Sequence, residues 1–123
     1  MLSVPLSDLL DALREPGTSD LSATRIAELF GLQLQDLATI ASVHHGTVQT
    51  HPESQKLQDT LRDLVRVLYA AVLVQPDRDQ AISLIGNVPI PAFRDKTLLQ
   101  LVAEGRIEDA IDYLESIRSG AVG

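Results

Sequence analysis

The stretch LQDLATIASVHHGTVQT, residues 34–50, has the spacing of a helix-turn-helix. In this motif two short helices cross closely, so the first needs a small residue facing the second and the turn needs a compact residue. Ala38, Ser42, Val43 and Val48 fill the places that pack at the crossing. Ser42 stands where glycine is most common, so it must adopt the turn conformation at some energetic cost. The stretch therefore predicts a helix-turn-helix in the first half of the chain.

The same motif is unusual in its charge, because it holds no Arg and no Lys from Gln35 to Thr50. Phosphate contacts supply most nonspecific DNA affinity, so a monomer should bind DNA poorly. Two interpretations stay open: a DNA-binding module that works only as a dimer or in a larger complex, and a helical hairpin used as scaffold. In the first, Gln pairs with adenine and Thr meets a thymine methyl group or a phosphate. The predicted DNA-binding residues are Arg25, His44, His45, Thr47, Gln49, Thr50 and Lys56.

The composition narrows the classes of function. The chain has 123 residues, a net charge of −7 and no Cys. Without Cys there are no disulfides, Cys-bound zinc or thiol nucleophiles, and the histidines lack carboxylates at ligand spacing, so we expect no metal and no cofactor. No apolar run is long enough to span a membrane, so we expect a cytoplasmic protein. An acidic chain is repelled on average by nucleic acid, which favours a protein partner.

Apolar side chains recur at three- and four-residue intervals along the chain, which predicts an all-α fold. We expect an N-terminal helix and loop over residues 1–20, and the helix-turn-helix with a long central helix over 21–75. A small helical lobe follows over 76–123. Pro52 is expected at the first position of the central helix, which joins the two lobes.

Polar and glycine residues predict where the shorter helices begin and end. Ser22 should cap a helix that Gly31 closes in a left-handed conformation. Asp77 should open the helix that follows the central one, and Asp95 should cap a helix over residues 96–104.

The stretch NVPIPAFRDKTLLQLVAEGRIEDAIDYLESIRSGAVG, residues 87–123, combines a Pro-containing elbow with two helices. Its order and spacing resemble the toxin-binding domain of the Xre/MbcA/ParS-type antitoxin family. In two respects it departs from that family's pattern: Arg94 and Asp95 stand where a glycine commonly follows the elbow, and AISLIGN, residues 81–87, lacks an aromatic residue. The matching residues are Asn87, Pro89, Pro91, Phe93, Thr97, Leu98, Leu101, Val102, Gly105, Ile111, Leu114, Ile117 and Gly120.

The resemblance covers the chain from about residue 20 to its end and implies an Xre-like helix-turn-helix in front of the toxin-binding domain. It implies a dimeric type II antitoxin that covers the active site of a cognate toxin, frequently a RES-type, NAD-consuming enzyme, and autoregulates its operon through operator DNA. The alternative is a free-standing helix-turn-helix repressor whose C-terminal half dimerises. Nothing in the sequence resembles a nucleophile with its base, so we expect no enzymatic activity.

The last helix carries the residues expected to contact the toxin. Its acidic face could meet the basic residues that an NAD pocket keeps for phosphates, and Tyr113 offers a rigid anchor with a polar tip. The tail after it is small and uncharged apart from the terminal carboxylate, and both insertion into a cavity and simple fraying stay open. The predicted toxin-binding residues are Asp109, Asp112, Tyr113, Ser116, Ile117, Ser119, Gly120, Ala121, Val122 and Gly123.

Overall fold

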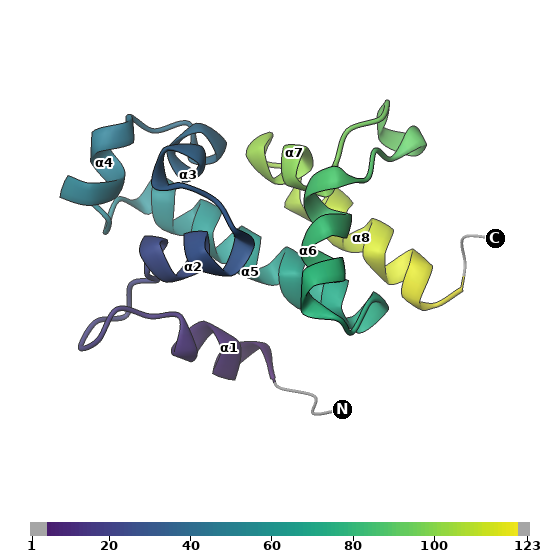
Figure 1. Ribbon diagram of the computed structural model, residues 1–123, viewed down its shortest axis with the longest axis horizontal. Coiled ribbons are helices and arrows are strands. Elements are labelled where there is room, and N and C mark those ends of the chain that lie inside the picture. Colours follow the sequence, from purple (N-terminus) through teal and green to yellow (C-terminus); the bar gives the residue numbers. More distant parts are fainter. Residues whose placement is uncertain (1–4, 121–123) are drawn as a thin grey trace. The chain divides into compact units, whose positions relative to one another are not determined.

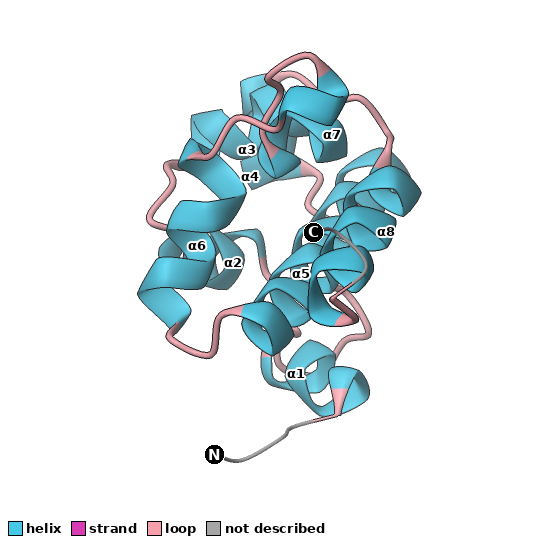
Figure 2. Cartoon of the chain, turned by 90° about the vertical axis from the view of Figure 1, so that its right-hand side faces the viewer, coloured by secondary structure: helices cyan, strands magenta, loops and turns pink. Residues whose placement is uncertain are grey.

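A computed structural model describes residues 5–120 of the chain (Figure 1). These residues form α-helices and one short 3-10 helix, with two isolated β-bridges and no β-strand among them (Figure 2). The predicted all-α fold is therefore confirmed. The chain divides into two compact units, Met1–Val65 and Arg66–Gly123, and the boundary falls inside the longest helix, α5 (Gln55–Val74). None of the described helices is both long and apolar enough to cross a membrane.

The first unit contains α1 (Leu6–Ala12), α2 (Ala23–Phe30), α3 (Leu34–Ala41), α4 (His45–Thr50) and the first half of α5. Helix α3 packs against both α2 and α4. Because the chain has no Trp and few aromatic residues, the core of this unit is aliphatic apart from Phe30. Its fully buried side chains include Leu21, Ile26, Leu37, Leu57, Leu61 and Leu64.

Short-range signals define the helix ends of this unit as the sequence predicts. The Ser22 side chain accepts a hydrogen bond of 3.1 Å from the Arg25 N–H at the start of α2. Gly31 ends α2 in the left-handed conformation with φ +69°. Ser42, between α3 and α4, is left-handed too with φ +57°, so it bears the cost expected of a non-glycine residue in this turn.

The start of α5 differs from the prediction. The helix begins at Gln55, and Pro52 lies in the turn before it, so the expected position of Pro52 inside the helix is wrong. The Pro52 carbonyl accepts a hydrogen bond of 2.7 Å from Nε2 of Gln58, one turn into the helix. This contact holds Pro52 in the turn. The first hydrogen bond of the helix runs from the Gln58 N–H to the Ser54 carbonyl, so α5 begins directly after Ser54.

The second unit contains the rest of α5, α6 (Arg78–Asn87), the 3-10 turn η1 (Pro91–Phe93), α7 (Leu98–Ala103) and α8 (Ile107–Arg118). Helix α7 packs against both α6 and α8. Asp77 caps α6 as predicted, because its carboxylate accepts a hydrogen bond of 2.9 Å from the Gln80 N–H. The buried side chains of this unit include Leu68, Ala71, Ile85, Ile90, Leu98, Leu101 and Leu114.

Thr97, not Asp95, caps α7, so the predicted cap is wrong. The Thr97 hydroxyl accepts a hydrogen bond of 3.1 Å from the Gln100 N–H, and the Gln100 side chain accepts one of 2.8 Å from the Thr97 N–H. This reciprocal pair is a capping box. Asp95 cannot serve as the cap because the bridge between Ile90 and Lys96 holds it in the preceding turn, where its φ is +65°.

Candidate protein- and DNA-binding surfaces

The rings of Phe93 and Tyr113 pack edge to face in the second unit, with centroids 6.2 Å apart and planes at 73°. Phe93 ends η1 and Tyr113 lies in the middle of α8, so the pair fastens the turn to the last helix. The guanidinium carbon of Arg106 lies 5.3 Å from the centre of the Phe93 ring. Aromatic and cation–π contacts of this kind each stabilise by roughly 1 kcal/mol. Both rings are half-buried, so part of each stays available to a partner.

Arg106 also belongs to a network of charges. Its Nε lies 2.9 Å from the Asp109 carboxylate, and its Nη1 lies 3.6 Å from Glu104. Glu104 also accepts a hydrogen bond from Lys96, and this bond is the main cause that lowers the pKa of Glu104. Desolvation acts in the opposite direction, and the charges of Lys96 and Arg106 lower the pKa further. The network therefore neutralises Asp109 within the chain and leaves its charge less available to a toxin than the sequence suggests.

The other predicted toxin-binding residues lie on α8 and just after it. Asp112 is exposed and has no ion pair within the described residues. The Ser116 hydroxyl donates a hydrogen bond of 2.7 Å to the Tyr113 carbonyl, and the Ser119 hydroxyl donates one of 3.1 Å to the Ser116 carbonyl. Ile117 is half-buried, and Ser119 and Gly120 are exposed. Ala121, Val122 and Gly123 lie outside the described residues.

In the first unit, the predicted DNA-binding residues of α4 are mostly exposed. Nδ1 of His44 accepts a hydrogen bond of 3.1 Å from the Gly46 N–H, so this histidine caps α4. The ring of His45 stacks on His44 with centroids 4.3 Å apart. Thr47 is half-buried; Gln49 and Thr50 are exposed, and the Thr50 hydroxyl donates to the Gly46 carbonyl at 2.8 Å. The surface of α4 is therefore polar and carries no fixed positive charge.

The two basic residues predicted to support DNA binding differ in their surroundings. Arg25 is exposed, but its Nη1 donates hydrogen bonds of 3.1 Å to the Ala12 carbonyl and 3.2 Å to the Arg14 carbonyl. Arg25 therefore holds the last residue of α1 and the segment that follows it. Lys56 is exposed near the start of α5 and has no ion pair within the described residues. Of these two cations, only Lys56 is unengaged.

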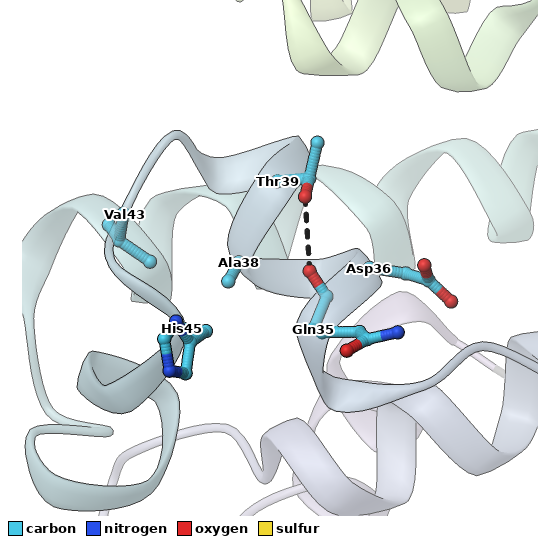
Figure 3. Close-up of a pocket in the computed structure, with 6 residues that line it drawn as sticks. All are labelled: Gln35, Asp36, Ala38, Thr39, Val43 and His45. Carbon is cyan, nitrogen blue, oxygen red and sulfur yellow. Dashed lines mark hydrogen bonds between the residues drawn. The ribbon is translucent and has the colours of Figure 1, made fainter.

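A groove of about 480 Å³ runs beside α3 and the start of α4 (Figure 3). Its polar groups are largely satisfied: Thr39 Oγ1 donates to the Gln35 carbonyl at 3.1 Å, and Asp36 accepts from the Gln33 N–H at 2.9 Å. With one carboxylate and no Arg or Lys in its lining, the groove does not suit a phosphate. The residues that line it are Gln35, Asp36, Ala38, Thr39, Val43 and His45. Across residues 5–120 no cluster of three or more His, Cys, Asp or Glu side chains could hold a metal ion.

This arrangement of eight α-helices within residues 5–120 defines a small all-α protein of an architecture that occurs in a toxin–antitoxin complex. The fold is similar to that of a chain in the crystal structure of the M. tuberculosis MbcT-MbcA toxin-antitoxin complex, with a TM-score of 0.64 and 19% sequence identity. The similarity covers 83% of this chain and 95% of that one. The sequence matches no family model and no curated protein. This similarity shows that the chain shares its all-α fold with a component of that complex.

Proposed function

We propose that this protein is a type II antitoxin that binds a cognate toxin through α8 and the residues after it. The observation that carries the proposal is the similarity of its fold, over nearly the whole of the matched chain, to a component of a toxin–antitoxin complex. The half-buried ring of Tyr113, fixed by Phe93, supports it, because rigid aromatic anchors dominate the energetics of protein interfaces.

The proposed toxin is a RES-type, NAD-consuming enzyme whose active site the last helix and tail cover. Such a pocket keeps basic residues for phosphates, and Asp112 offers an unpaired carboxylate to them. Asp109, which Arg106 already neutralises, contributes less to this attraction. Inhibition is steric and electrostatic, and this chain performs no chemistry.

The test uses the protein encoded by the adjoining reading frame as the candidate toxin. The wild-type chain should bind it in a pulldown and restore growth to cells that express it. Tyr113→Asp should weaken binding by roughly 30-fold or more, because it removes an aromatic anchor. Gln80→Asp introduces the same charge at an exposed site on α6 and should leave binding unchanged. A wild-type chain that neither binds the product nor rescues the cells contradicts the proposal.

The second candidate is a free-standing repressor, which the left-handed turn at Ser42 between α3 and α4 favours. Autoregulation by an antitoxin would use the same module as a dimer. Deleting α8 would not separate the two functions, because Ala110 and Leu114 are buried and their loss would unfold the second unit. Tyr113→Asp does separate them: a repressor keeps its operator binding and has no toxin to lose.

A further inference from the structure

The elbow between α6 and α7 contains two consecutive residues with a left-handed backbone. Arg94 has φ +57° and Asp95 has φ +65°. Residues with a side chain rarely adopt this conformation, whereas glycine adopts it without a steric penalty. A turn selected only for its shape would be more stable with glycine at these positions. The elbow keeps two charged side chains there instead.

Hydrogen bonds fix the backbone of this elbow. The Ile90 carbonyl accepts from the N–H groups of Phe93 and Asp95, both at 2.9 Å, and the Ile90 N–H donates to the Lys96 carbonyl at 3.0 Å. The Ile90 side chain is only 2% exposed, so the base of the elbow belongs to the core. Arg94 is therefore attached to a fixed point, and little backbone entropy is lost when it binds a partner.

Arg94 differs from the other cations of its unit. Residues 66–120 contain six Arg and Lys side chains, and five of them form ion pairs with acidic residues of the same unit. Arg94 is exposed and has no ion pair within the described residues. The five pairs are Arg66 with Glu108, Arg78 with Asp79, Lys96 with Glu104, Arg106 with Asp109, and Arg118 with Glu115.

The elbow adjoins the surface proposed to bind the toxin. Phe93 directly precedes Arg94, and its ring packs on Tyr113 of α8. At the other end of the elbow, Val88 is 40% exposed, the most exposed of the large apolar side chains among residues 5–120. An unpaired arginine on a fixed turn, with an exposed apolar residue two positions before that turn, is typical of an interface, where Arg is enriched.

We propose that Arg94 is a specificity-determining contact that binds a carboxylate of the partner protein beside the Tyr113 anchor. The guanidinium fork matches a carboxylate in a bidentate geometry. This chain has a net charge of −7, so on average it repels an acidic site on a partner. An acidic site is therefore bound favourably only in the orientation that places its carboxylate on Arg94. This inference rests on the proposed function, because its partner is the toxin that α8 binds.

Glycine at position 94 should change stability and binding in opposite directions, and the test measures both. The wild-type chain, Arg94→Gly and Arg94→Glu are titrated calorimetrically into the purified product of the adjoining reading frame, and the Tm of each is measured. Arg94→Gly should raise the Tm, because glycine accepts φ +57°, and yet weaken binding at least tenfold. Arg94→Glu should weaken binding further, through repulsion from the partner carboxylate.

Ser42→Gly is the matched control, since Ser42 has the same φ of +57° in the first unit. It should raise the Tm and leave toxin binding unchanged. Arg94→Gly binding as tightly as the wild-type chain would overturn the inference alone. If that variant lost affinity for DNA and kept its affinity for the protein, the ligand would be a phosphate and the inference would also fall. A wild-type chain that does not bind the product overturns the proposed function and this inference together.

Discussion

The side-chain amide of Gln58 pairs with the backbone of Leu21 through two hydrogen bonds. Its Oε1 accepts from the Leu21 N–H at 2.8 Å, and its Nε2 donates to the Leu21 carbonyl at 3.1 Å and to the Pro52 carbonyl at 2.7 Å. Gln58 is only 6% exposed, so these bonds replace those it would make with water. One side chain thus fixes both the segment that enters α2 and the turn that enters α5.

Gln58→Leu should lower the free energy of unfolding by about 2–4 kcal/mol. The substitution keeps a similar volume but leaves the Leu21 N–H and the carbonyls of Leu21 and Pro52 without this partner in the interior. Urea unfolding followed by circular dichroism measures the change. Gln55→Leu, at an exposed position of the same helix, should change stability by only about 0.5 kcal/mol. Equal stability of the two variants would show that the Gln58 amide does not anchor this unit.

Thr97→Ala should destabilise the protein by about 1 kcal/mol, the usual cost of removing an N-cap. It removes the hydroxyl that accepts from the Gln100 N–H and breaks the capping box of α7. Thr97→Ser keeps the hydroxyl and should stay close to the wild-type protein in the same urea titration. If the serine variant loses as much as the alanine variant, the methyl group rather than the cap explains the effect.

The sequence predicts a helix end well when one nearby side chain determines it. Ser22 and Asp77 each accept a hydrogen bond from an N–H three residues ahead, and Gly31 supplies a left-handed residue. These are local arrangements, so the order of residues contains the information needed to infer them.

The two helix starts that the sequence mispredicts depend on more distant contacts. Pro52 lies outside α5, where Gln58 binds its carbonyl, and Asp95 lies in a turn that the bridge from Ile90 to Lys96 closes. Both residues have suitable local preferences for the position expected of them. The residue at which each helix begins is determined by a contact between residues several positions apart, and the local preference of a single residue cannot predict that contact.

The candidate site was predictable only in part. Tyr113 is recognisable as an aromatic residue on a polar helix face, but its packing with Phe93 depends on the path of the elbow, twenty positions earlier. The pair of Arg106 and Asp109, three residues apart, could have been found from helical spacing alone. Asp109, expected from its acidic helix face to be a free charge, is instead paired with Arg106.

The stability contributed by Glu104 should depend on pH in a defined direction. The hydrogen bond from Lys96 lowers the pKa of Glu104 below its ordinary value of 4.5. A carboxyl group with a lowered pKa in the folded state contributes its stability above the pKa of the unfolded chain and loses it as the pH falls through the folded value. The stability difference between the wild-type protein and Glu104→Gln should therefore be present at pH 7 and shrink at pH 3. Urea midpoints at both values measure it, and a difference that grows towards acid would contradict the assignment.

DNA binding by the isolated protein should be weak and sensitive to salt, because the surface of α4 contributes no fixed positive charge. A Kd in the micromolar range or weaker is expected at physiological salt, which electrophoretic shifts can measure, with tighter binding when dimers or toxin complexes pair two modules. Gln49→Lys should tighten DNA binding, because Gln49 is exposed on α4 and the new lysine can contact a phosphate. The slope of log Kd against log salt concentration should steepen by about 1, the value expected for one added phosphate contact. Gln80→Lys adds the same charge on α6, in the other unit, and should change neither the affinity for DNA nor its salt dependence. Equal effects of the two substitutions would mean that added charge alone matters, and that α4 has no particular role in contacting DNA.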